Sequence, residues 1–236
     1  MLLKELWYNL EALANADGTD DFIGPDDFNR IVKVELLEFT SNIVKKEMSE
    51  GGGRMLDYLM DFATAATYQI AVPSDCLELH GVSFDTGSEV KHVKIIPKDL
   101  FSFLNENLMT PPLAYNYVAY IDNPSGVQTL IMRPSVAGTI TLSFYRKPLD
   151  PFLDYYLNAN KEFVPLDDGA SILITGGAQY RDGATSGTQN SITEELDIPT
   201  EYHDKFFDRM VDRLGLKTRD QLEIQYAMAK KQEDQG

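Results

Sequence analysis

The spacing of the apolar residues changes twice along this chain of 236 residues, and this limits the folds open to it. Near the start, Leu3, Leu6, Leu10 and Leu13 recur every three or four residues, which is the period of a helix. From about residue 64 to about residue 150 the apolar residues instead form short runs typical of strands. The helical period returns in Thr200–Gly215. The sequence therefore predicts an α+β chain.

The second helix is expected to be long. It begins after Gly24-Pro25, with Asp26 and Asp27 where the helix dipole favours negative charge. Gly51-Gly52-Gly53 is expected to end it, because glycine adopts the backbone conformations that helices do not. Its apolar face is formed by Phe28, Ile31, Val32, Leu36, Phe39 and Ile43.

The middle stretch predicts a small antiparallel β domain, either a sandwich or a barrel. Turn sequences such as Asn123-Pro124-Ser125-Gly126 separate its short runs. One helix, Lys98–Leu108, is expected before Pro111-Pro112. The expected strands are Tyr68–Val72, Leu77–Phe84, Val90–Ile96, Tyr115–Ile121, Val127–Arg133 and Thr139–Arg146.

The predicted architecture is a helical bundle, built from N- and C-terminal helices, with the small β domain inserted. Residues 1–70 supply the N-terminal helices, residues 71–150 the β insertion, and residues 151–236 a loop, a closing strand and the C-terminal helices. In the last part, Gly176–Ser191 is expected to be a mobile surface loop. Thr218 opens a final helix, with Gln221 completing a capping box.

The sequence offers little for catalysis, and we expect no enzyme, no cofactor and no metal. A single cysteine, Cys76, excludes an intrachain disulfide and a Cys-rich zinc site. His80, His92 and His203 are not at metal-ligand spacing. The acidic run Asp17–Asp21 lacks the glycine and glutamate that a calcium loop requires. The glycines of 176–187 lack the Gly-Lys-Ser/Thr of a phosphate loop.

The formal net charge of −16 restricts the partners. Such a chain repels phosphate, so a protein that grips nucleic acid is disfavoured. A channel lined with carboxylates would instead let DNA pass without binding it. No apolar run approaches the ~18 residues of a membrane span, and no export signal is evident, so we expect synthesis in the cytoplasm.

The helix Thr200–Gly215 has two charged stripes at a spacing of four residues. Like charges along one stripe repel slightly within a helix. Opposite stripes of neighbouring copies would relieve this repulsion in a ring contact. A solvated face with local pairs such as Lys205–Asp208 explains the pattern equally well. The candidate interface residues are Asp204, Asp208 and Asp212 on one stripe and Lys205, Arg209 and Arg213 on the other.

The order of three segments resembles a known family. A helix opening with Gly24-Pro25-Asp26-Asp27-Phe28-Asn29-Arg30 comes first, and a strand insertion then runs from Ala71-Val72-Pro73-Ser74-Asp75 to Leu142–Pro148. A step into a closing helix follows at Leu196–His203. Over nearly the whole chain this order resembles the head-to-tail adaptors of short-tailed bacteriophages, also called gatekeeper or tail-tube A proteins. The neck ring proteins of crAss-like phages are the most similar in character.

The resemblance implies a structural protein of the virion neck, assembled in the host cytoplasm. It implies a ring of about twelve copies below the portal protein. Closing such a ring requires heterologous contacts, in which two different surfaces of neighbouring copies meet. The other implied partners are neighbouring tail or ring proteins, and DNA passes through the lumen. The family's C-terminal docking role then falls to Thr218–Gly236, with Leu222, Tyr226 and Ala229 as its apolar stripe. That helix would equally suit packing on its own chain. Two alternatives of other classes are a phage-associated glycan hydrolase and a monomeric β-rich binding module.

Overall fold

The architecture was determined as a computed structural model that describes residues 2–16, 24–106, 117–123 and 126–216. The chain divides into two compact units. The inserted unit is Val44–Lys147, and the terminal unit joins Met1–Ile43 to Pro148–Gly236. Helix α2, Pro25–Glu50, contributes residues to both. Helix α2 begins at Pro25 and ends before Gly51, whose φ of 85° is the left-handed conformation expected of a helix-ending glycine, so the predicted limits are confirmed.

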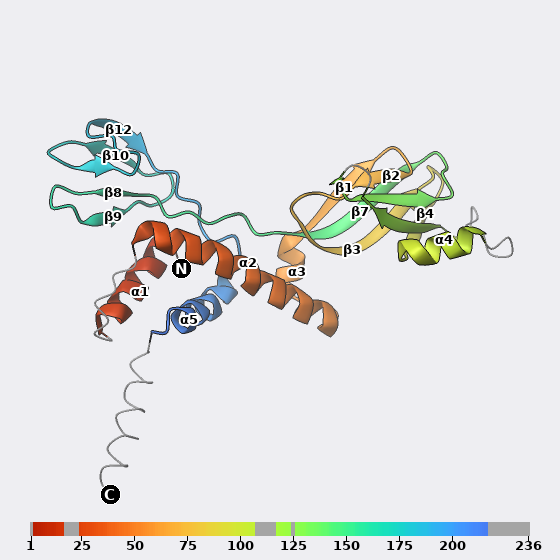
Figure 1. Ribbon diagram of the computed structural model, residues 1–236, viewed down its shortest axis with the longest axis horizontal. Helices are drawn as coiled ribbons and strands as arrows, with labels where there is room; N and C mark the ends of the chain where they lie inside the picture. The colour runs from red at the N-terminus through yellow and green to blue at the C-terminus, as the bar shows by residue number, and fades with distance from the viewer. Residues whose placement is uncertain (1, 17–23, 107–116, 124–125, 217–236) are drawn as a thin grey trace, which may run out of the picture. The chain divides into compact units, whose positions relative to one another are not determined.

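The inserted unit is a seven-stranded sheet in the order β1-β7-β3-β4-β5-β6-β2. Figure 1 labels five of these strands, together with α3 and α4. All its pairs are antiparallel except β4 with β5. Short α3 precedes the sheet, and α4 packs on β5 by stacking Phe101 on Tyr120 at 4.3 Å. The elements are α3 (Arg54–Leu59), β1 (Met60–Ala65), β2 (Gln69–Ala71), β3 (Cys76–Asp85), β4 (Val90–Ile95), α4 (Lys98–Glu106), β5 (Val118–Asp122), β6 (Thr129–Arg133) and β7 (Thr139–Arg146).

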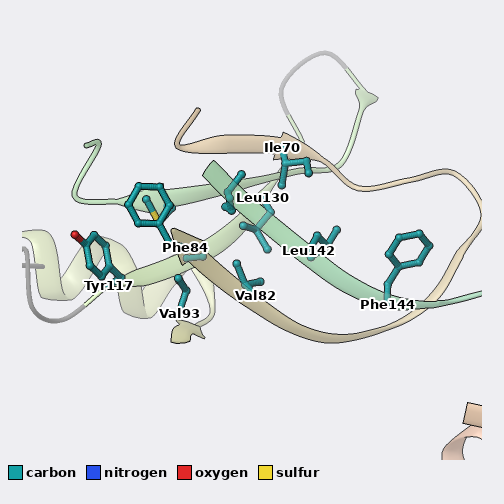
Figure 2. Packing of buried hydrophobic residues seen from close by; sticks show 11 residues of the cluster. Ile70, Val82, Phe84, Val93, Tyr117, Leu130, Leu142 and Phe144 are labelled. Atoms are coloured by element: carbon teal, nitrogen blue, oxygen red, sulfur yellow. The ribbon is translucent and has the colours of Figure 1, made fainter. Parts of the chain in front are cut away.

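The core of the inserted unit is apolar and lies on one face of this curled sheet. Alternate residues of a strand point to the same face, so Ile140, Leu142 and Phe144 of β7 all enter it. Figure 2 shows Val82, Phe84 and Val93, which belong to the same cluster. All six predicted strands are present, with ends that differ by a few residues. Strand β1 was not predicted, because its sequence Met60-Asp61-Phe62-Ala63-Thr64-Ala65 has no regular alternation.

The terminal unit combines helices with two small sheets (Figure 1). Its sheets have the orders β11-β8-β9 and β10-β12, and an isolated bridge joins Phe152 to Glu194. Phe39 of α2 packs edge-on against Phe206 of α5 at 5.4 Å. The elements besides α2 are α1 (Leu3–Ala16), β8 (Tyr155–Leu157), β9 (Phe163–Pro165), β10 (Ser171–Ile174), β11 (Gln179–Tyr180), β12 (Gly187–Asn190), the 3-10 turn η2 (Thr200–Tyr202) and α5 (His203–Arg213).

The predicted fold class is wrong. The molecule is mostly β, and its N- and C-terminal helices do not form a helical bundle with a single β insertion. The expected loop Gly176–Ser191 contains β11 and β12, because glycines such as Gly177 and Gly183, at φ of 89° and 93°, allow tight turns between very short strands. The expected closing strand near Leu196 is reduced to the bridge at Glu194.

Candidate functional site

The two charged stripes of α5 differ in the contacts that they make within the chain. Arg209 donates from Nε to Oε2 of Glu35 at 2.8 Å and from a terminal nitrogen to Glu38 at 2.9 Å. Arg213 Nε lies 3.0 Å from Oε1 of Glu35, as an ion pair without hydrogen-bond alignment. Glu35 is only 2% exposed, so both arginines neutralise a buried carboxylate on α2. These two candidate interface residues therefore have a role inside the terminal unit.

The other four candidates on α5 are exposed. Asp204, Asp208 and Asp212 lie along one side of the helix, and the Lys205 ammonium lies 5.2 Å from the centre of the Tyr202 ring. The stripe open to solvent on α5 is consequently the acidic one. The three predicted docking residues, Leu222, Tyr226 and Ala229, lie outside the described residues.

Strands β10 and β12 form a surface that the sequence did not predict. They pair antiparallel, from Ser171 opposite Asn190 to Ile174 opposite Gly187. Ile172 and Ile174 face the unit's interior, so Leu173 points outward and is 65% exposed. Ile192, just after β12, is 52% exposed. Among the described residues neither strand has a further neighbour, so each presents an open edge.

These two open edges, which we call the β10–β12 edge, lack the features that usually prevent strands from pairing between molecules. Those features are charged side chains, especially lysine, and proline. The sequences are Ser-Ile-Leu-Ile in β10 and Gly-Thr-Gln-Asn in β12, with no charge and no proline. A quarter of the chain is charged, so this neutral edge differs from the rest of the surface. The run Ile172-Leu173-Ile174 was the available sequence signal, although three residues are too few to show a period.

A buried carboxylate fixes the position of this small sheet. Asp154 has no exposed surface, and its Oδ2 accepts hydrogen bonds from the Tyr180 hydroxyl and from the Ile192 N–H at 3.1 Å. Its Oδ1 accepts from Arg181 Nε at 2.9 Å. The Tyr180 hydroxyl also lies 3.1 Å from the carbonyl oxygen of Asn190, the last residue of β12. Burial raises the pKa of Tyr180, with Asp154 adding to the shift, so the phenol keeps its proton.

A second exposed apolar site lies on the inserted unit. Strand β1 ends its sheet and pairs only with β7 among the described strands. Ala63 and Ala65 pack on the core, and Phe62 points outward with 62% of its surface exposed. The inserted and terminal units thus each present an end strand with a large exposed apolar side chain, and the two surfaces differ in sequence.

The described residues offer few groups for chemistry. No group of three or more His, Cys, Asp or Glu side chains among them is arranged to hold a metal ion. His80 lies on β3, where its Nδ1 is 3.0 Å from the Tyr145 hydroxyl, whereas His92 lies on β4 and His203 on α5. Burial, reinforced by Asp75 and then Glu78, raises the pKa of the Cys76 thiol, which disfavours the reactive thiolate.

Within the described part of the chain, no helix combines the length and hydropathy that crossing a bilayer requires. Comparison with known proteins adds no family: no protein-family model matches the chain, and no curated protein matches it.

Proposed function

We propose that this chain is a structural subunit that assembles with copies of itself into a ring, as a head-to-tail adaptor between the portal and the tail of a bacteriophage. One observation supports self-assembly most directly, namely the neutral, open edge of β10 and β12 with Leu173 exposed. An unguarded edge invites pairing with another chain, and an exposed leucine favours a contact that removes it from water. Contact with a neighbouring copy covers both features.

A ring requires two different surfaces on each subunit, because each copy contacts the next through a heterologous interface, in which one surface binds the other. The β10–β12 edge supplies one candidate surface. The β1 edge, with Phe62, supplies a second candidate of different sequence. This pair of surfaces favours a heterologous contact over a symmetric dimer, in which one surface binds the same surface of a second copy.

The acidic charge fits a lumen through which DNA slides. A net charge of −16 and the exposed Asp204, Asp208 and Asp212 repel the phosphate backbone. The place in the virion neck and the portal as partner rest on the family resemblance of the segment order. In this proposal the protein binds no cofactor and performs no catalysis.

Electron micrographs of the purified chain, alone and mixed with the portal protein of the same virus, test the proposal. We expect closed rings in both samples, free in the first and seated on portal particles in the second. Particles of single-chain size in either sample would overturn it. Turnover of a capsule or cell-wall glycan by such single chains would establish the hydrolase class instead.

A further inference from the structure

A cavity of about 560 Å³ in the inserted unit and one of about 330 Å³ beside Glu35 have no aromatic ring among their described lining residues, but a third cavity does. It measures about 510 Å³ and lies in the terminal unit, between α1 and the turn that joins β8 to β9. Its walls combine three aromatic rings with two carboxylates and one amine. The lining residues are Trp7, Tyr8, Glu11, Lys161, Glu162 and Phe163.

The aromatic side of the cavity consists of Trp7, which is only 3% exposed, and of the more accessible rings of Tyr8 and Phe163. Trp7 and Tyr8 are adjacent on α1, with ring centres 5.2 Å apart and planes inclined by 56°. Tyr8 is 43% exposed, so its ring is accessible from solvent. Phe163, across the cavity, is held edge-on by Tyr155 at 5.3 Å. Aromatic faces attract cations, and arginine in particular stacks on them.

The carboxylates give the cavity an excess of negative charge. The lining groups carry two negative charges, on Glu11 and Glu162, and one positive charge, on Lys161, so their net charge is −1. Burial raises the pKa of Glu11, the direction expected when the desolvation of a carboxylate is not offset by a nearby cation. Glu162 is held in place by the side-chain nitrogen of Asn158, 2.7 Å from its Oε2.

We propose that this cavity binds an arginine side chain of a partner protein. The planar guanidinium stacks on an aromatic ring and offers paired N–H donors to carboxylates, which match the two kinds of wall. The net charge of −16 attracts a cationic segment and repels an anionic one. The inference does not depend on the proposed ring function, since it concerns one pocket within the terminal unit.

The single tryptophan of the chain provides the readout, because Trp7 lines the cavity. The probe is the peptide acetyl-Gly-Arg-Gly-amide, and the comparison is the same peptide with citrulline, which has the shape of arginine without its charge. We expect the NMR signal of the Trp7 indole N–H to shift and saturate with the arginine peptide only. E11Q should weaken binding about 5- to 10-fold, the effect of losing one partly buried ion pair.

The matched control is E5Q, which removes the same charge from an exposed position on the same helix, outside the cavity. Its affinity should stay within about twofold of the unaltered chain, because solvent and salt screen the charge of an exposed carboxylate that does not line the cavity. Equal shifts with both peptides, no shift with either, or equal weakening by E5Q and E11Q would overturn the proposal. A shift produced by chitotriose but not by the arginine peptide would overturn it too, in favour of a saccharide site.

Discussion

The two units contain β structure of opposite character. The sheet of the inserted unit surrounds an apolar core in which Phe84, Leu130 and Leu142 are fully buried. The small sheets of the terminal unit are joined around Asp154, a fully buried carboxylate that binds Tyr180 and Arg181. Apolar burial is non-directional and tolerant, whereas a buried polar network stabilises only while all its partners are present. The two units should therefore respond differently to mutation.

The largest expected effect is the loss of Asp154. D154A removes the buried carboxylate that binds the Arg181 guanidinium, the Tyr180 hydroxyl and the Ile192 N–H, and should lower the free energy of unfolding by about 3–5 kcal/mol. Denaturant unfolding followed by Trp7 fluorescence measures it, since the only tryptophan lies in the terminal unit. The control D168A removes an exposed carboxylate and should change little. Similar losses in both variants would contradict the role of Asp154.

A core truncation in the inserted unit should cost slightly less. L142A creates a cavity and removes apolar contacts, with an expected loss of about 3 kcal/mol. Far-UV circular dichroism during denaturation measures it, together with amide exchange in β7. L100A, at an exposed leucine of the same unit, is the matched control and should remain within about 0.5 kcal/mol of the unaltered chain. Equal effects would mean that the apolar core does not stabilise this unit.

A smaller effect is expected at Glu35, the second buried carboxylate of the terminal unit. E35Q keeps the shape of the side chain but removes the charge facing Arg209 and Arg213. Glutamine keeps one acceptor oxygen beside the two arginines, whereas D154A removes the whole side-chain carboxylate, so the loss should be about 1–2 kcal/mol, below that of D154A. E194Q is the control, because Glu194 is an exposed glutamate of the same unit and makes no ion pair with Arg209 or Arg213. A larger loss for E35Q than for D154A would mean that Glu35, and not Asp154, is the main buried charge of this unit.

The smallest effect concerns pH. Burial lowers the pKa of His203 below its ordinary value of 6.5, so the folded terminal unit binds fewer protons than the unfolded chain. The stability from neutral His203 is thus fully present above about pH 6.5 and is lost as the pH falls below it. Denaturant midpoints measured between pH 7.5 and pH 5 should decrease, and H203Q should flatten the decrease. An unchanged slope in H203Q would assign it to other groups.

The difference between the units also explains what the sequence could predict. In the inserted unit, alternation over runs such as Thr139–Arg146 is long enough to identify strands, and turn residues mark their ends. In the terminal unit, β8 to β12 are two to four residues long, too short for any period to appear. Their positions depend on Asp154, and a buried aspartate looks in sequence like any surface aspartate.

The candidate contact residues were predictable only in part. The stripes on α5 follow from helical spacing. The sequence cannot show that Arg209 and Arg213 face Glu35, because Glu35 lies 174 positions before Arg209 in the chain. The β10–β12 edge was missed because glycine, serine and threonine usually indicate a loop. The absence of charge in this segment was visible, yet its meaning depends on the strand pairing.

The central claim is that copies of this chain meet through the β10–β12 edge. Sedimentation tests it most directly, on the purified chain, on L173K and on V90K. Val90 is exposed to a similar extent as Leu173 but lies on β4, in the middle of the seven-stranded sheet. We predict a closed multimer for the unaltered chain and for V90K, and single chains for L173K, because a lysine at the edge blocks strand pairing. Identical sedimentation of all three proteins, whether as multimers or as single chains, would contradict the claim.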